Sequence, residues 1–268
     1  MIRHTAEVGS NIMCILFLAI NRHPQYPLII AANRDEFYAR PSTAMHYWPD
    51  QPQILAGRDD LKGGTWLGVT RQGKFCAVTN FRTGNPESED ALSRGELVRK
   101  YLAGKMDDPE YAGYLSENGH RYSPFNLVYG DVRKMQVYCN QDQSLARLDD
   151  GFHSLSNGNM DQHWPKMSLG VQKLTALVDQ HCAINIDELN VIMHDQTRPH
   201  EDDLPDTGVG RDVESLISAI FINGADYGTR ATSYVLYSAG GLEVIEQNYD
   251  QSGNITGQQA FNIPNDHG

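Results

Sequence analysis

The chain has 268 residues, of which 40% are hydrophobic, a size that suits one globular domain or a tightly fused pair. It carries 34 acidic and 22 basic side chains, giving a formal net charge of -12 at pH 7. A surface of that charge repels phosphate backbones and anionic lipid headgroups, so we expect no nucleic-acid partner.

The first thirteen residues, MIRHTAEVGSNIM, show neither helical periodicity nor strand alternation. Two accounts make the next residue, Cys14, the start of the mature protein: translation begins at Met13, or residues 1–13 are a short propeptide. In a third account the segment stays attached and Cys14 is a small hydrophobic residue at the head of a buried strand. We treat 1–13 as an extension and 14–268 as a single domain.

Strand-like segments dominate the first eighty residues. Cys14 to Ile20 is apolar on both faces, which is typical of a central strand covered on two sides. Leu28 to Ala32 predicts the second strand of a hairpin and runs into the polar tetrad Asn33-Arg34-Asp35-Glu36. Further strands are expected at 53–56, 65–70 and 75–79.

Helical patterns follow in the middle of the chain. Ser93 and Glu96 have capping-box spacing and predict a helix start, and Asp108-Pro109 predicts a second helix to about Leu115. Additional helices are expected at 164–181, 186–193 and 212–217, with a polar loop at 195–211 long enough to be a lid. The remaining strands are expected at 125–129, 135–138, 152–155, 229–237, 242–248 and 256–261. This order favours an antiparallel α+β fold, a four-layer αββα sandwich of two sheets between helices.

The four cysteines lie far apart and form no CxxC pair; they are Cys14, Cys76, Cys139 and Cys182. This usage indicates neither a zinc knuckle nor a disulfide framework and fits a reducing cytosol. The sequence also lacks a membrane-length apolar stretch and a signal-peptide h-region. We therefore predict a cytoplasmic protein without integral membrane association.

Cys14 suggests acyl-transfer chemistry. At the start of a mature chain it would carry both a thiol nucleophile and an α-amine that can act as its base. The two groups titrate close together, at about 8.5 and about 8 when unperturbed. Arg34 and Arg230 are candidates to favour the thiolate and to hold an anionic group, and Asn80 is a candidate oxyanion donor. Asp35 could orient the α-ammonium group, although surface or turn roles are an ordinary alternative for each residue.

Eight ordered blocks beginning with Asn33-Arg34-Asp35-Glu36 behind a Met-Cys strand resemble the NRDE family, also called the transport-and-Golgi-organisation family. The other blocks are Gly63-Gly64-Thr65-Trp66-Leu67-Gly68, Thr79-Asn80-Phe81-Arg82, Ser93-Arg94-Gly95, Leu155-Ser156-Asn157, Trp164-Pro165-Lys166, Leu204-Pro205-Asp206-Thr207-Gly208 and Tyr227-Gly228-Thr229-Arg230. The resemblance covers nearly the whole chain from Met13 onward.

That family in turn resembles the N-terminal-nucleophile hydrolases of the penicillin V acylase and bile salt hydrolase group, which have the αββα sandwich and begin at a catalytic cysteine. The resemblance implies catalytic roles for Cys14, Arg34, Asp35, Asn80, Asn157 and Arg230. We assign substrate binding to Asn33, Glu36, Trp66 and Arg82. In the amidases the matching arginine and aspartate are not adjacent, whereas here they are. Neighbours on a strand face opposite sides, so Asn33 with Asp35, or Arg34 with Glu36, would then be the inward pair.

A metal site is not expected. The ten histidines form no HExxH motif, and the acidic and histidine residues at 194–203 lie in a polar stretch typical of a solvated loop. Our leading hypothesis is a hydrolase that cleaves a linear amide or related acyl bond of a small molecule through an acyl-Cys14 intermediate, with no required cofactor. The alternative is a non-enzymatic carrier of haem or an acyl lipid such as acyl-CoA, in which haem is a ligand. The oligomeric state is left open.

Overall fold

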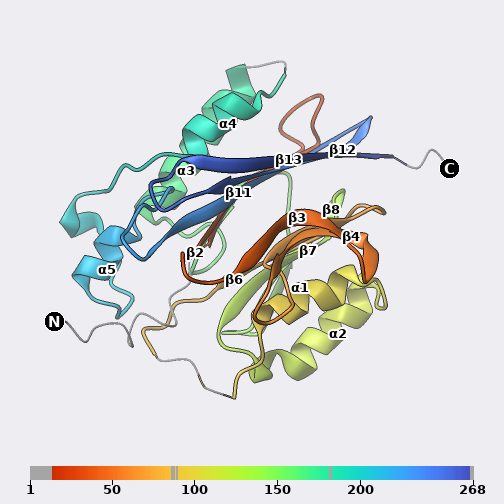
Figure 1. Ribbon diagram of the computed structural model, residues 1–268, viewed down its shortest axis with the longest axis horizontal. Helices are drawn as coiled ribbons and strands as arrows, with labels where there is room; N and C mark the ends of the chain where they lie inside the picture. The colour runs from red at the N-terminus through yellow and green to blue at the C-terminus, as the bar shows by residue number, and fades with distance from the viewer. Residues whose placement is uncertain (1–13, 86–87, 89, 181–182, 266–268) are drawn as a thin grey trace.

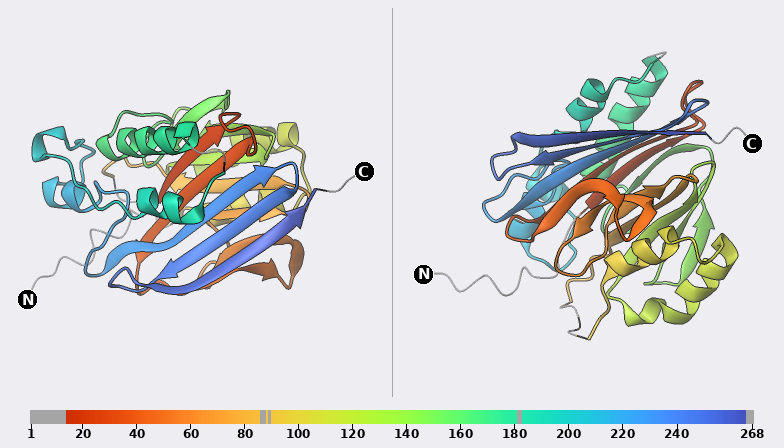
Figure 2. Two further views of the ribbon diagram at one scale, coloured as in Figure 1. Left: turned by 90° about the horizontal axis from the view of Figure 1, so that it is seen from above. Right: turned by 45° about the vertical axis from the view of Figure 1, so that its right-hand side comes forward.

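Two antiparallel sheets lie face to face, with helices on the outer side of each (Figures 1 and 2). This computed structural model describes residues 14–85, 88, 90–180 and 183–265, so the predictions for 1–13 and for Cys182 lie outside the described residues. The predicted α+β sandwich is confirmed.

The first sheet has the strand order β10-β1-β2-β11-β12-β13 and the second β3-β4-β5-β6-β7-β8-β9. The strands are β1 Cys14–Ile20, β2 Leu28–Phe37, β3 Ser42–Trp48, β4 Gln51–Asp59, β5 Leu67–Thr70, β6 Lys74–Asn80, β7 Phe125–Asp131, β8 Lys134–Cys139, β9 Ser144–Arg147, β10 Gly151–Leu155, β11 Tyr227–Ser238, β12 Gly241–Tyr249 and β13 Ile255–Pro264. The α-helices are α1 Arg94–Leu102, α2 Asp108–Asn118, α3 Pro165–Gln180, α4 Ile186–Met193 and α5 Arg211–Leu216.

Strand β1 is covered on both faces, as its composition predicts. Leu16 and Leu18 pack into the core between the two sheets, whereas Ile15 and Phe17 pack under α3 and α4. Helix α3 comes so close that a Cβ on its Gly170 would lie 2.0 Å from the Phe17 ring. Helices α1 and α2 cover the outer face of the second sheet in a third apolar cluster. The hydrophobic core therefore has three layers, and β1 borders two of them.

Strand β2 is longer than the sequence pattern predicts, because it continues through the polar tetrad to Phe37. It pairs antiparallel with β1 so that Cys14 stands opposite Arg34. On its other side β11 places Thr229 opposite Asp35 and Ala231 opposite Arg34, which leaves Arg230 as the extra residue of a β-bulge.

Three local predictions differ from the structure. Strands β3 and β9 were not predicted; β9 is exposed at all four residues and so has no apolar alternation to reveal it. Ser93 is the N-cap of α1 but forms no side-chain capping bond. The capping box belongs to α2 instead, where the side chains of Asp107 and Glu110 each accept a hydrogen bond from the other residue's backbone N–H. The N-cap is therefore Asp107, one residue before the predicted Asp108. Within the described residues, the helices are all too short or too polar to span a membrane.

Candidate active site

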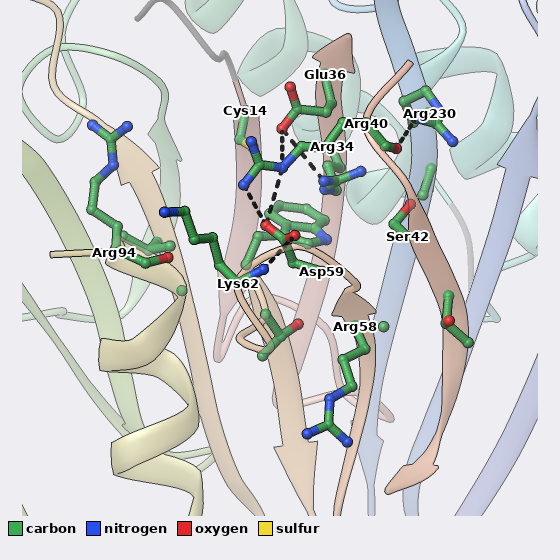
Figure 3. Close-up of a pocket in the computed structure, with 18 of the residues that line it drawn as sticks. Cys14, Arg34, Glu36, Arg40, Ser42, Arg58, Asp59, Lys62, Arg94 and Arg230 are labelled. Atoms are coloured by element: carbon green, nitrogen blue, oxygen red, sulfur yellow. Dashed lines mark hydrogen bonds and ion pairs between the residues drawn. The ribbon is translucent and has the colours of Figure 1, made fainter. Parts of the chain in front are cut away.

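A cavity of about 650 Å³ opens where the ends of the two sheets meet, and Cys14 lines it (Figure 3). Its wall is built from strands of both sheets, from the N-terminus of α1 and from the loop before β5. A hydrogen bond of 2.7 Å from the Met45 backbone N–H on β3 to Glu246 Oε1 on β12 ties the sheets together beside it. Residues from eight strands and one helix can therefore act on one bound molecule.

Cys14 is the first residue of β1 and is 4% exposed. Burial raises the pKa of its thiol to about 12, and the charge of Asp35 adds to the rise. The guanidinium of Arg34 and the backbone N–H of Asp35 favour the thiolate and oppose this shift. With the chain as described, the thiol is protonated at neutral pH.

Arg34 and Glu36 share the cavity face of β2, which answers the question of which pair points inward. Arg34 Nη2 lies 3.4 Å from Glu36 Oε2, and both residues line the cavity. Arg40 Nε lies 3.5 Å from the same carboxylate oxygen, and its Nη2 lies 2.5 Å from Asp59 Oδ2. Burial raises the pKa of Glu36, while the Arg34 charge lowers it. Two arginines thus hold one buried carboxylate next to Cys14.

Asp35 and Asn33 point to the opposite face of β2, under the helices. Asn33 Nδ2 donates to the backbone oxygens of Met193 and Ile220 at 2.9 Å each, so it fastens the helical layer to the sheet. The structure places Asn33 outside the cavity wall, away from its predicted substrate-binding position.

Asp35 is fully buried, and only one of its two carboxylate oxygens has a hydrogen-bond partner among the described residues. Its Oδ1 accepts a hydrogen bond from Thr229 Oγ1 at 2.6 Å, whereas Oδ2 has no partner among the described residues. Burial raises the pKa of Asp35 to about 7, and the positive charge of Lys166 counteracts part of that rise. Asp35 therefore lies close enough to influence the Cys14 thiol, although its side chain is not on the cavity side.

Asn80 and Asn157 are joined by a hydrogen bond, but only Asn80 lines the cavity. Asn157 is 1% exposed, and its Nδ2 donates to the backbone oxygen of Asn80 at 2.9 Å. Asn80 lines the cavity, and its own Nδ2 is buried without a hydrogen-bond partner among the described residues. A buried amide donor with no acceptor is costly to keep, which is typical of a group that a ligand completes.

Arg230, the bulge residue, lines the cavity, and its guanidinium is held by backbone carbonyl groups at the end of β2. Its Nη1 donates to the carbonyl oxygens of Phe37, Tyr38 and Arg40 at 3.1, 3.2 and 2.9 Å. Burial and the nearby Arg34 charge lower its pKa. Arg230 therefore fixes the turn after β2 and adds positive charge beside Arg34.

Of the remaining two predicted substrate-binding residues, one lines the cavity and the other does not. Trp66 lines the cavity and packs against two apolar clusters, the one between the sheets and the one under α1 and α2. Arg82 lies outside the cavity wall, where its Nη1 is 2.7 Å from Glu214 Oε2 and its guanidinium lies over the Trp164 ring. The structure thus brings Cys14, Arg34, Glu36, Trp66, Asn80 and Arg230 to one cavity and leaves Asn33, Asp35, Arg82 and Asn157 behind it.

Several polar residues near the site had no role in the sequence analysis. Lys166 is buried at the start of α3, with Nζ 3.0 Å from the Ile217 backbone oxygen, and burial lowers its pKa to about 7. Lys62, Arg94 and Ser123 line the cavity from separate elements. Their sequence signals were weak, although Lys166 and Arg94 fall inside the family blocks. The described residues contain no group of three or more potential metal ligands.

Two stacked antiparallel sheets between helical layers are the architecture of the N-terminal-nucleophile hydrolase fold, which this chain shares with a solved structure. A mutant of the conjugated bile acid hydrolase from Clostridium perfringens matches with a TM-score of 0.51, over 93% of this chain and 92% of that chain. At 11% identity this similarity is one of fold alone.

The chain belongs to the family "Transport and Golgi organisation 2", whose model matches residues 13–251. The Transport and Golgi organization 2 homolog of Mus musculus is 34% identical over 249 residues, covering 85% of this chain and 90% of that protein. The corresponding protein of Homo sapiens is 34% identical over 250 residues, with the same shares covered. The resemblance identified from the sequence is therefore confirmed.

Proposed function

We propose that the protein is an N-terminal-nucleophile hydrolase that cleaves a linear amide or related acyl bond through an acyl-Cys14 intermediate. One observation carries the proposal: Cys14 shares a cavity with Arg34 and with the unpartnered amide of Asn80. A nucleophile, a cation and an oxyanion donor are the groups that acyl transfer needs in one place.

The chemistry requires Cys14 to carry a free α-amine. The amine takes the thiol proton, the thiolate attacks the acyl carbon, and the oxygen of the tetrahedral intermediate receives a hydrogen bond from Asn80 Nδ2. The α-ammonium then returns the proton to the leaving amine, and a thioester remains on Cys14. A water molecule, deprotonated by the α-amine, attacks the thioester and releases the acid and the thiol.

The electrostatics support this dependence on the α-amine. A thiol with a pKa of about 12 is inert at neutral pH, and an adjacent α-ammonium would supply a positive charge that favours the thiolate. Asp35 lies one position beyond the end of the β1–β2 pairing, at the N-terminal side of Cys14. Its unpartnered Oδ2 is a suitable acceptor for the α-ammonium.

The carrier hypothesis receives less support from the cavity. Cys14 and Tyr249 are the side chains in the described wall that could ligate haem iron, and the Cys14 thiol has a raised pKa that disfavours the thiolate. Charged and polar side chains make up most of the wall, with Trp66 and Val78 among its few larger apolar members. These residues do not fit an apolar macrocycle.

The test compares the chain that begins at Cys14 with the chain that retains residues 1–13. We expect an electrophilic acyl probe to form a covalent adduct, seen as added intact mass, with the first form only. Cys14→Ala should abolish the adduct. Cys139→Ala, which removes another buried thiol, should leave it unchanged.

Turnover is then measured against a panel of linear amides and esters. A chain beginning at Cys14 that shows neither an adduct nor turnover would refute the hydrolase. An adduct that forms equally well with residues 1–13 attached would refute the α-amine mechanism while leaving Cys14 as the nucleophile.

A further inference from the structure

The cavity is cationic although the protein is acidic. Six positive side chains line the described wall, against three carboxylates from Glu36, Asp59 and Glu246. The six are Arg34, Arg40, Arg58, Lys62, Arg94 and Arg230. In a chain with a formal net charge of -12, a local excess of positive charge concentrates anionic ligands in this cavity.

Some of these cations are already engaged by protein groups. Arg34 and Arg40 hold Glu36, and Arg58 makes a two-point ion pair with Asp50, with its Nη1 and Nη2 at 2.7 and 3.0 Å from the carboxylate. The Arg58 guanidinium accordingly points away from Cys14 (Figure 3). Lys62 differs, because no described carboxylate lies within ion-pair distance of its ammonium group, and its side chain extends into the cavity (Figure 3).

The N-terminus of α1 lies beside Lys62. Ser93, Arg94 and Gly95 all line the cavity, and the Ser93 side chain does not cap the helix. An α-helix presents unsatisfied backbone N–H groups and a partial positive charge at this end, a combination that favours anions.

Close backbone packing fixes this helix end against the loop that carries Lys62. A Cβ on Gly64 would lie 2.6 Å from the Gly95 carbonyl carbon, so the two glycines allow the contact. The Thr65 N–H donates to the Gly95 carbonyl oxygen at 3.2 Å across it. The loop and the helix therefore form one wall rather than two independent segments.

A second observation points to a ligand at the same place. Ser123 is 7% exposed and lines the cavity, yet its Oγ has no hydrogen-bond partner among the described residues. Its neighbour Pro124 accepts a hydrogen bond from Arg94 Nη1 at 3.2 Å, which places Ser123 next to the arginine. A buried hydroxyl without a protein partner is unfavourable, and an anionic acceptor bound beside it would satisfy it.

We propose that Lys62, Ser93, Arg94 and Ser123, together with the N-terminus of α1, form an anion subsite, here called the α1 subsite. It holds a phosphate or carboxylate group of the substrate while the acyl carbon lies at Cys14. This inference rests on the proposed function and adds the substrate class: an acyl compound that carries a separate anionic group.

The test is a calorimetric titration of the full chain with inorganic phosphate and, separately, with acetate. The better ligand identifies the anion. Lys62→Gln should weaken its binding about tenfold, the usual worth of a charge-assisted hydrogen bond, and Ser123→Ala should weaken it about fivefold. Lys105→Gln, which removes an exposed lysine outside the cavity wall, is the matched control and should bind as the wild type does.

Two results would overturn the α1 subsite: binding of neither anion, or equal loss of affinity in Lys62→Gln and Lys105→Gln. The Cys14→Ala variant separates the two proposals, because it should retain full phosphate or acetate affinity. Anion binding without any turnover would contradict the hydrolase alone. Turnover without anion binding would contradict the α1 subsite alone.

Discussion

Cys14 and Arg34 stand directly opposite each other in the antiparallel pairing of β1 and β2, so both side chains project from the same face of the sheet. The pairing sets the chemistry of the cavity, because it brings a guanidinium to the sulfur without any loop contribution. A group placed by strand register is held more rigidly than one placed by a loop.

Replacing Arg34 should make the thiol less reactive. In Arg34→Gln the positive charge that favours the thiolate is lost, so the pKa of Cys14 should rise further. Each unit of rise removes about nine-tenths of the remaining thiolate, and alkylation by iodoacetamide at fixed pH should slow about tenfold. The measurement is the pH dependence of the alkylation rate, followed by intact mass.

Arg58→Gln is the control for this substitution. Arg58 also lines the cavity, but it pairs with Asp50 and points away from Cys14 (Figure 3). Equal slowing in both variants would show that the general charge of the cavity, rather than the cross-strand pairing, governs the thiol.

Asp35→Asn should change stability in opposite directions in the two forms of the chain. The pKa of Asp35 is raised to about 7 from 3.8, so between these pH values the folded protein binds more protons than the unfolded chain. Stability from this group is therefore present at low pH and is lost as pH rises through about 7. With residues 1–13 attached, Asp35→Asn should stabilise the protein at pH 8, because it removes a buried unpaired charge.

In the chain that begins at Cys14, the same substitution should destabilise the protein, since the α-ammonium would lose its carboxylate partner. Urea unfolding at pH 8 and at pH 5 measures both effects. A substitution effect of the same sign and size in both forms would show that Asp35 does not interact with the α-amine.

Asn80 and Asn157 should separate catalysis from stability. Asn80 Nδ2 makes no hydrogen bond within the described protein, so Asn80→Ala should leave the free energy of unfolding nearly unchanged. Loss of an oxyanion donor should lower kcat about 100-fold to 1000-fold. Asn157→Ala breaks a buried hydrogen bond and should cost about 1–3 kcal/mol of stability. The interpretation fails if Asn80→Ala unfolds as easily as Asn157→Ala and still turns over substrate normally.

Arg82 and Glu214 form a buried ion pair whose disruption should be costly. Both side chains are nearly inaccessible, and Glu214 also accepts hydrogen bonds from Thr207. Arg82→Met would leave the Glu214 carboxylate uncompensated, and we expect a loss of about 3–5 kcal/mol in urea unfolding. Arg133→Met, which breaks an exposed pair with Asp131, should cost about 1 kcal/mol or less. A raised KM in Arg82→Met without loss of stability would restore the predicted substrate-binding role.

The layered fold was predictable because its signals are local. The apolar run from Cys14 to Ile20 has no polar face, and helix α3 carries a clear apolar stripe. Strand β3 was missed because its mixed side chains lie half-buried, with partial pairing to β4. Such partly exposed strands are determined by their neighbours and not by their own periodicity.

The site was predictable only in part. Strand alternation limited the pair facing the cavity to two choices. Choosing Arg34 with Glu36 required knowing that β2 continues to Phe37, which the sequence pattern did not indicate. The role of Lys166 depends on a contact with the Ile217 carbonyl oxygen 51 residues away, and that of Ser123 on a cavity formed by segments distant in sequence. No local pattern reports contacts of this kind.

The bulge in β11 has a consequence for how this sequence can change. Thr229 and Ala231 pair with Asp35 and Arg34, which are consecutive residues of β2, so Arg230 has no partner position of its own. Loss of the single codon for Arg230 would leave the residues on both sides of it paired with the same residues of β2. Their side chains would also keep pointing to the same faces of the sheet. Elsewhere in β11 a one-residue deletion would turn one part of the strand over. The chain can therefore gain or lose this cavity arginine in one genetic step, while the rest of the sheet keeps its pairing.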